Sequence, residues 1–196
     1  MKSRFLETIK AVDGVICNLE YHQVRLEDAL KSLGIQHFHS LTQHLTPPLD
    51  GLYRCRVIYD EYDLEVSYHR YEKRNIKSLK IVCDDTIDYS YKYENRMALD
   101  KLFAQREDCD DVLIVQNSFI KDTSIANIAL FDGVKWVTPE NPLLKGTTRA
   151  RLLEKGKIIE KKILISDLHN YSQLALMNAM IDFDIIASEN IRNHIC

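Results

Sequence analysis

Lys92 lies between two tyrosines, in the segment Tyr91-Lys92-Tyr93, where a strand-like run meets the beginning of a helical pattern. Aromatic neighbours keep water away from an amine, which lowers the pKa of a lysine and leaves more of it as the neutral nucleophile. The pattern therefore predicts a lysine that condenses with a carbonyl compound. The alternative is a surface lysine at a helix start, which is favoured for an isolated lysine because most lysines are exposed.

A carboxylate comes thirty residues after this lysine. Asp122 follows Phe119-Ile120-Lys121 and precedes an apolar strand. A carboxylate in this position can keep a pyridine nitrogen protonated, which makes the ring an electron sink. The alternative is a turn aspartate beside a hairpin, a common use of this residue type.

The third segment with chemical potential is Gly146-Thr147-Thr148, which opens a predicted helix. The free N–H groups of a helix start and two hydroxyls suit a phosphate dianion, although a threonine cap without a ligand is the common case. Taken together, the lysine, the carboxylate and the helix start match the aldehyde, the ring nitrogen and the phosphate of pyridoxal phosphate.

An antiparallel sheet with one helix is predicted for the first part of the chain. Asp13-Gly14 predicts a two-residue hairpin turn, and apolar residues at helical spacing predict a helix over 20–33 that ends at Gly34. The strand-like runs lie at 3–12, 15–18, 52–60, 63–72 and 78–84. One helix packed on such a sheet forms an α+β layer.

The short polar segment 84–89 predicts a link between a domain of residues 1–84 and a second domain of residues 85–196. The expected fold is therefore α+β in two lobes. The elements predicted for the second domain are helices over 94–106, 147–155 and 167–176 and strands near 112–116, 125–131, 134–138 and 160–165.

Composition narrows the class of protein. The chain has 196 residues, 45% of them hydrophobic, and a net charge of -3, which argues against a general nucleic-acid binder. No apolar run is long enough to span a bilayer, and the first residues contain no apolar stretch of the kind found in signal peptides. These features predict a cytoplasmic protein without nucleic-acid or membrane partners.

The cysteines and histidines predict neither a disulfide framework nor a metal site. The five cysteines are far apart, odd in number and without a Cys-x-x-Cys pair, so reduced thiols are expected. His37, His39 and His44 lie in a polar stretch without a cysteine or a clear carboxylate partner, which makes a metal site a minor alternative.

The order of several motifs resembles the class IV (fold type IV) pyridoxal-phosphate enzymes over nearly the whole chain. The segments that carry the resemblance are Phe5-Leu6-Glu7-Thr8, Asp13-Gly14, His22-Gln23-Val24-Arg25-Leu26, Lys92-Tyr93-Glu94-Asn95-Arg96, Asp122 to Asn127, Trp136-Val137-Thr138-Pro139 and Leu143 to Arg149. The resemblance implies two lobes with the cofactor in the cleft between them. It also implies a homodimer, because neighbouring subunits of this family build each cleft together.

The resemblance assigns roles to individual residues. Lys92 matches the lysine that bonds covalently to the cofactor and moves the Cα proton, and Asp122 takes the place of the carboxylate at the ring nitrogen. Arg25 matches the arginine that binds the phosphate, for which its forked donors are suited. The other cofactor-binding matches are Asn127, Thr147, Thr148 and Asn178.

Three departures from the family pattern are visible. Most members have glutamate where this chain has Asp122, the chain begins inside the family's first lobe, and Met97 stands where branched-chain aminotransferases carry tyrosine. The Lys-x-x-Asn-Arg arrangement is more similar to 4-amino-4-deoxychorismate lyase, which releases pyruvate and 4-aminobenzoate for folate synthesis. An aminotransferase of the branched-chain or D-amino acid type, also acting on a small amino substrate, is the first alternative. A non-catalytic cofactor- or partner-binding protein is the second.

Overall fold

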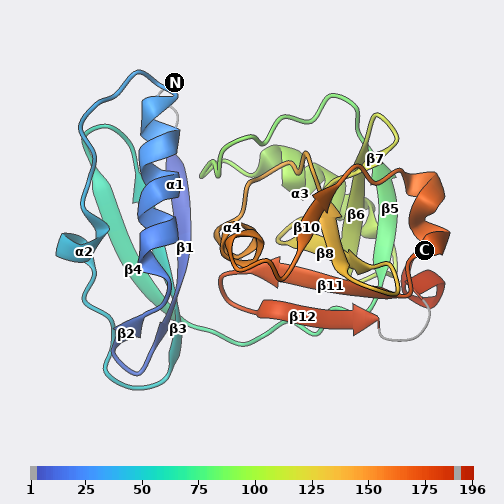
Figure 1. Ribbon diagram of the computed structural model, residues 1–196. Coiled ribbons are helices and arrows are strands. Elements are labelled where there is room, and N and C mark those ends of the chain that lie inside the picture. Colours follow the sequence, from blue (N-terminus) through green and yellow to red (C-terminus); the bar gives the residue numbers. More distant parts are fainter. Residues whose placement is uncertain (1–3, 188–190) are drawn as a thin grey trace. The chain divides into compact units, whose positions relative to one another are not determined.

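The computed structural model describes residues 4–187 and 191–196 (Figure 1). Contacts divide the chain into two compact units. Unit 1 consists of Met1–Lys73 and Tyr91–Asn95, and unit 2 consists of Arg74–Ser90 and Arg96–Cys196. This division differs from the predicted boundary between residues 84 and 85 because the strand before that boundary pairs in unit 2, while Tyr91–Asn95 returns to unit 1.

Unit 1 is a four-stranded antiparallel sheet in the order β2-β1-β3-β4, with the long helix α1 along it (Figure 1). Its elements are β1 (Phe5–Val12), β2 (Val15–Ile16), α1 (Leu19–Lys31), α2 (Leu41–His44), β3 (Leu52–Tyr59) and β4 (Leu64–Arg70). The sheet with one packed helix is the layer predicted from the sequence.

Local signals explain the hairpin and the helix of unit 1. Asp13 and Gly14 both have positive φ, 46° and 80°, as required by the turn that joins β1 to β2. On α1, the buried residues His22, Leu26, Ala29 and Leu30 form one face. That face packs against the buried side chains of β1 and β3, which is the main source of stability for a helix of this length.

Unit 2 contains two further sheets, in the orders β5-β6-β7 and β10-β9-β8-β11-β12. Its strands are β5 (Leu79–Cys83), β6 (Asp111–Gln116), β7 (Phe119–Ile120), β8 (Asn127–Phe131), β9 (Trp136–Pro139), β10 (Ile159–Lys161), β11 (Gln173–Asn178) and β12 (Asp182–Ala187). Its helices are α3 (Met97–Phe103), α4 (Thr147–Glu154) and the 3-10 helices η1 (Ala104–Arg106), η2 (Ile165–Asn170) and η3 (Ile191–His194). One apolar core joins residues of both sheets.

Two predictions about segments of unit 2 are wrong, one on strand pairing and one on secondary structure. The run 78–84 was expected to join the antiparallel sheet of the first domain, but β5 pairs parallel with β6. The helix predicted over 167–176 is instead η2 followed by β11, which lies between β8 and β12. The four residues Leu174–Met177 are all buried, and a short apolar run of this kind has the same appearance in a helix and in a central strand.

The prediction of five reduced thiols is also wrong, because Cys109 and Cys196 form a disulfide. The last residues of the chain run beside β5: the Cys196 N–H donates to the Leu79 carbonyl, and the Ile81 N–H donates to the Cys196 carbonyl. Because η1 contacts β5 as well, two cysteines 87 residues apart in sequence meet there. The cytoplasmic location stays a prediction, and the expectation of reduced thiols no longer supports it.

Among the described residues, none of the helices combines the length and the apolar character that a membrane crossing requires.

Candidate functional site

Lys92 belongs to unit 1 and lies at the centre of a three-residue turn, closed by the Tyr93 N–H on the Tyr91 carbonyl at 2.9 Å. The Leu6 N–H donates to the Lys92 carbonyl at 2.8 Å and ties this turn to β1. Tyr93 stacks on Phe5 with ring centroids 5.6 Å apart, and Tyr91 meets the same ring edge-on at 6.1 Å. Both tyrosines pack against the core of unit 1, so they anchor the backbone that carries Lys92.

Arg25 and His22 lie one turn apart on α1, and both reach the carboxylate of Glu7 on β1. Arg25 donates from Nε to Oε1 at 2.8 Å and from Nη2 to Oε2 at 2.5 Å, while the His22 Nδ1 lies 2.6 Å from Oε2. Glu7 is 0% exposed. A buried carboxylate needs partners of this kind, because an unpaired charge in an apolar interior is costly. We call Glu7, His22 and Arg25 the Glu7 cluster.

The charges in the Glu7 cluster follow from its burial and its pairing. Burial alone would raise the pKa of Glu7, but the charge of Arg25 and the hydrogen bonds from His22 and Arg25 lower it to about 2. Burial lowers the pKa of His22, and the charges of Arg25 and Lys92 lower it further, against the effect of Glu7. His22 is therefore neutral near pH 7, and its Nδ1 carries the proton because ionised Glu7 only accepts.

We expect Glu7→Gln to destabilise the ligand-free protein at pH 7 by on the order of 3 kcal/mol, from a pKa of 4.5 lowered to about 2. Because the folded-state pKa is the lower one, the stability from ionised Glu7 is complete above pH 4.5 and is lost as the pH falls toward 2. The difference from the wild type should therefore shrink on acidification. Urea denaturation at pH 7 and pH 3 measures it, with the exposed Glu65→Gln as control. A difference independent of pH would contradict the ionised state of Glu7.

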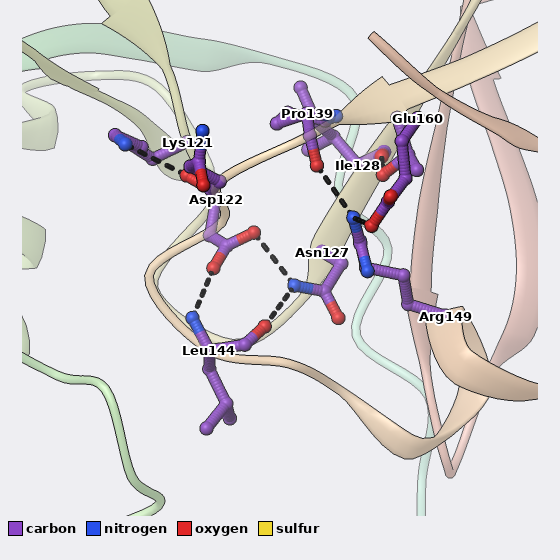
Figure 2. Close-up of polar contacts among 10 residues, drawn as sticks. Lys121, Asp122, Asn127, Ile128, Pro139, Leu144, Arg149 and Glu160 are labelled. Carbon is purple, nitrogen blue, oxygen red and sulfur yellow. Dashed lines mark hydrogen bonds and ion pairs between the residues drawn. The ribbon is translucent and has the colours of Figure 1, made fainter. Parts of the chain in front are cut away.

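Asp122 lies in unit 2, between β7 and β8, and its carboxylate is held by two N–H donors (Figure 2). The Asn127 Nδ2 donates to Oδ1 at 2.8 Å, and the Leu144 N–H donates to Oδ2 at 2.9 Å. The same Asn127 Nδ2 donates to the Leu144 carbonyl at 2.7 Å. The Asp122 carbonyl accepts from the Ile114 N–H on β6. Hydrogen bonds thus hold both the backbone carbonyl and the carboxylate of Asp122. We call Asp122, Asn127 and Leu144 the Asp122 cluster.

Burial raises the pKa of Asp122 to about 6, although the N–H of Leu144, the amide of Asn127 and the charge of Arg149 all lower it. The Asn127 amide donates to one carboxylate oxygen, and the Leu144 N–H donates to the other. A buried carboxylate that costs energy when ionised is stabilised by a cationic N–H donor such as a pyridinium nitrogen.

The start of α4 lies next to the Asp122 cluster. Thr147 and Thr148 form its first turn and are buried, and the leading N–H groups of a helix have no acceptor within that helix. Gly146 precedes them, and a Cβ at this position would lie 2.1 Å from the Asn127 Oδ1. The helix start therefore approaches the amide closely because residue 146 has no side chain.

We expect Gly146→Ala to push the Asn127 amide away and to release one donor from the Asp122 carboxylate. Forcing a methyl group into a packed site lowers the free energy of unfolding by about 1–3 kcal/mol. The affinity for the cofactor should fall as well. Thermal unfolding and cofactor titration measure the two effects. Lys145→Ala, at the exposed neighbouring position, is the control and should change neither quantity.

Comparisons with known proteins give the family of this chain. The sequence profile of the family described as amino-transferase class IV matches residues 92–188. A crystal structure from Haemophilus somnus 129pt, provisionally described as a 4-amino-4-deoxychorismate lyase, is 35% identical and covers 92% of this chain and 97% of its own, with a TM-score of 0.83. This chain belongs to the class IV aminotransferase family. The expectation of a class IV enzyme with the corresponding fold is confirmed.

Two other proteins extend the similarity. An uncharacterised protein of Haemophilus influenzae is 38% identical over 181 residues, which are 89% of this chain and 96% of its own. A hypothetical aminotransferase from Mycobacterium tuberculosis, solved in a PLP-bound form, has a TM-score of 0.77 and covers 95% of this chain and 80% of its own. At 17% identity, the latter shows the class IV fold alone.

The structure brings some of the predicted class IV site residues together. Asp122 and Asn127 bond to each other in unit 2, where Thr147 and Thr148 open α4. The amide of Asn178 is already engaged by backbone groups, since its Oδ1 accepts from the N–H groups of residues 180 and 181 and its Nδ2 donates to the Ile125 carbonyl. Its contacts are those of a turn, and its role in phosphate binding stays a prediction.

Lys92 and Arg25 both lie in unit 1 of this class IV chain. Both charges lower the pKa of His22. Lys92 and Arg25 are 67 residues apart in sequence. Residues 92–94 pair beside β1, the strand that carries Glu7, the partner of Arg25.

Glu7, His22, Gly146 and Arg149 have no role assigned from the sequence. Glu7 and His22 stood in the motifs that carried the class IV resemblance, and the separation of His22 from Arg25 by three residues indicates one helix face. Arg149 is 3% exposed, and its Nη2 donates to the Pro139 carbonyl and to Glu160 (Figure 2). The pairing of β9 with β10 brings these two acceptors together, which no local pattern could reveal.

The histidines considered for a metal site contact backbone carbonyls. His39 Nε2 lies 2.9 Å from the Asp60 carbonyl, and His44 Nδ1 lies 2.8 Å from the Ser40 carbonyl. Within residues 4–187 and 191–196, no group of three potential metal ligands is present.

Proposed function

We propose that this protein is a pyridoxal-phosphate-dependent 4-amino-4-deoxychorismate lyase, which forms pyruvate and 4-aminobenzoate. The similarity to the Haemophilus somnus protein over nearly the full length of both chains supports this choice within class IV. The observation that carries the cofactor assignment is the buried, doubly hydrogen-bonded carboxylate of Asp122, whose pKa is raised to about 6.

The residues present fit this cofactor. An ionised Asp122 is costly in its buried setting, and a ring N–H⁺ offsets that cost. The N-terminus of α4 offers N–H groups and two threonines, and Gly146 keeps side-chain atoms away from the approach to Asn127. Both features suit a phosphate monoester, because helix starts bind anions through their free N–H groups and their dipole.

When bound, pyridoxal phosphate supplies an aldehyde that condenses with amines and a ring that withdraws electrons from the substrate Cα. Lys92 provides the amine for attachment, and its Nζ then takes the proton from Cα. Asp122 holds the proton on the ring nitrogen. Arg25, Thr147 and Thr148 would each supply donors to the phosphate group.

The lyase and the aminotransferase differ after the Cα proton has been removed. In a lyase, the substrate would lose its leaving group as pyruvate and Lys92 would keep the Cα proton, whereas in an aminotransferase Lys92 would pass this proton on and the substrate would leave as an oxo acid. The anchored turn at Lys92 serves either route. We favour the lyase because of the similarity over the full chain, and the amino acid aminotransferase is the alternative.

Product analysis tests the proposal. The protein is loaded with pyridoxal phosphate and incubated with 4-amino-4-deoxychorismate, and 4-aminobenzoate and pyruvate are quantified. Equal amounts of both products would support the lyase. A loaded protein that makes neither product but transfers amino groups from amino acids to oxo acids would establish the aminotransferase. Failure to bind the cofactor would favour the non-catalytic alternative.

We also propose a homodimer, on the ground that neighbouring subunits complete each site in the family that the sequence resembles. Sedimentation velocity of the loaded protein, with turnover measured at the same concentration, tests the assembly. A strictly monomeric species with full turnover would reject it.

A further inference from the structure

We infer that Glu7 is a positioning residue for cofactor binding: its carboxylate fixes the Arg25 guanidinium in the orientation in which this arginine binds the phosphate group. The inference deepens the proposed function and depends on its assignment of Arg25 to the phosphate. Glu7 itself is not expected to touch the cofactor.

The geometry of the Glu7 cluster supports this role. The carboxylate takes the Nε–Nη2 edge of Arg25 with two bonds, at 2.8 and 2.5 Å. Because a guanidinium is planar and its five donors have fixed directions, two bonds on one edge set both the plane and the rotation of the whole group. A long arginine side chain otherwise samples many rotamers, and ordering it on ligand binding costs entropy.

The position of Glu7 is itself well determined. It lies within β1, paired with Val57 of β3, so its backbone is fixed by the sheet. His22 Nδ1 approaches Oε2 at 2.6 Å from α1, which opposes rotation of the carboxylate. The three side chains come from α1 and β1, which pack on each other. This packing restricts the movement of the Arg25 side chain.

Two effects of Glu7 on phosphate affinity oppose each other. Its negative charge offsets the charge of Arg25 and so weakens the attraction for an anion, whereas its two bonds orient the donors of Arg25. In Glu7→Gln, an amide nitrogen replaces one of the two oxygens. Because both oxygens accept from Arg25, and Oε2 also from His22, the amide nitrogen opposes an Arg25 donor at either position. We expect Arg25 to leave its orientation in this variant, so the loss of positioning outweighs the gain in net charge.

The test is a double-mutant cycle of Glu7→Gln and Arg25→Ala, with two probes, pyridoxal phosphate and pyridoxal. The second probe lacks the phosphate but keeps the ring and the aldehyde. Dissociation constants come from absorbance titration, and the ³¹P resonance of the bound phosphate gives an independent signature. Glu65→Gln is the matched control, because Glu65 also pairs with an arginine, Arg4 at 2.6 Å, but at an exposed site.

We expect Glu7→Gln to weaken pyridoxal phosphate binding by about tenfold to a hundredfold, as for a lost charge-assisted contact. Pyridoxal binding should change by less than about twofold, because no phosphate is involved. In the Arg25→Ala background, Glu7→Gln should have no further effect, since Glu7 acts through Arg25. The bound ³¹P resonance should shift in Glu7→Gln and should be unchanged in Glu65→Gln.

Other results would overturn the inference. Equal losses of affinity for both probes would show that Glu7 has a general structural role. Additive losses in the cycle would show that Glu7 acts without Arg25. Tighter binding of pyridoxal phosphate by Glu7→Gln would show that the gain in net charge outweighs the loss of positioning. If Glu7→Gln fails to fold, Glu7→Asp replaces it in the test. Glu7→Asp keeps the charge but draws the carboxylate back by one methylene, so the preference of this variant for pyridoxal phosphate over pyridoxal must also fall. A wild type that binds neither probe would reject the proposed function instead, and an unchanged preference in Arg25→Ala would reject its assignment of Arg25.

Discussion

Lys92→Ala should reduce turnover by about a thousandfold or more, because the variant loses both the amine that attaches the cofactor and the base at Cα. The backbone of the turn is held by Leu6 and by the packed rings of Tyr91 and Tyr93, so the variant should fold normally. The absorbance band of covalently bound cofactor should disappear. Borohydride reduction followed by peptide mass spectrometry measures the attachment directly.

Lys31→Ala is the control for this substitution, since Lys31 is an exposed lysine of the same unit, paired with Glu27 at the end of α1. It should keep the absorbance band and the turnover. Lys92→Arg keeps a positive charge without a nucleophilic amine and should be as inactive as Lys92→Ala. Cofactor trapped on another lysine in the wild type would refute the assignment of Lys92.

Asp122→Asn should lose about a hundredfold to a thousandfold in turnover, while the phosphate contacts keep the cofactor bound. The amide cannot balance the charge of a protonated ring nitrogen, so the electron-withdrawing form of the ring is no longer stabilised. Steady-state turnover and cofactor titration of the same preparation separate the two effects. Asp132→Asn is a suitable control, because Asp132 also accepts two backbone N–H bonds but lies in an exposed turn.

The pH dependence of stability gives Asp122 a second readout, independent of activity. The folded-state pKa of about 6 lies above the ordinary value of 3.8, so the folded protein binds this proton more tightly than the unfolded chain. The stability of the ligand-free protein should therefore fall as the pH rises from 3.8 to about 6, by on the order of 3 kcal/mol, and the loss is complete above that. Asp122→Asn should lack this slope, and a slope equal to that of the wild type would contradict the buried, ionisable state of Asp122.

Local signals predicted much of the scaffold. Asp13-Gly14 has positive φ at both positions, as its turn requires, and α1 has one apolar face. Each of these features depends on residues a few positions apart, and this is why a sequence pattern can determine it. The same holds for the candidate site wherever a short ordered motif contains the residue, as for Lys92 and for the run from Asp122 to Asn127.

Long-range pairing explains the failures. The run Leu79–Cys83 is an apolar strand in either sheet, and only its parallel pairing with β6 places it in unit 2. Cys109 and Cys196 meet because the end of the chain pairs with β5. Arg149 is buried because Pro139 and Glu160 lie on two paired strands beside α4. In each case the partner lies outside the local segment, so periodicity and spacing carry no information about it.

By itself, then, the sequence determined the types of the reactive groups and most of the elements that carry them, because side-chain chemistry and backbone preference are local properties. The tertiary structure decided the environment of each group. Glu7 became the buried partner of Arg25 only when α1 packed on β1, and the pKa of Asp122 rose only when burial removed it from water. Burial and charge pairing depend on what surrounds a residue in space, and only the folded chain brings those surroundings together.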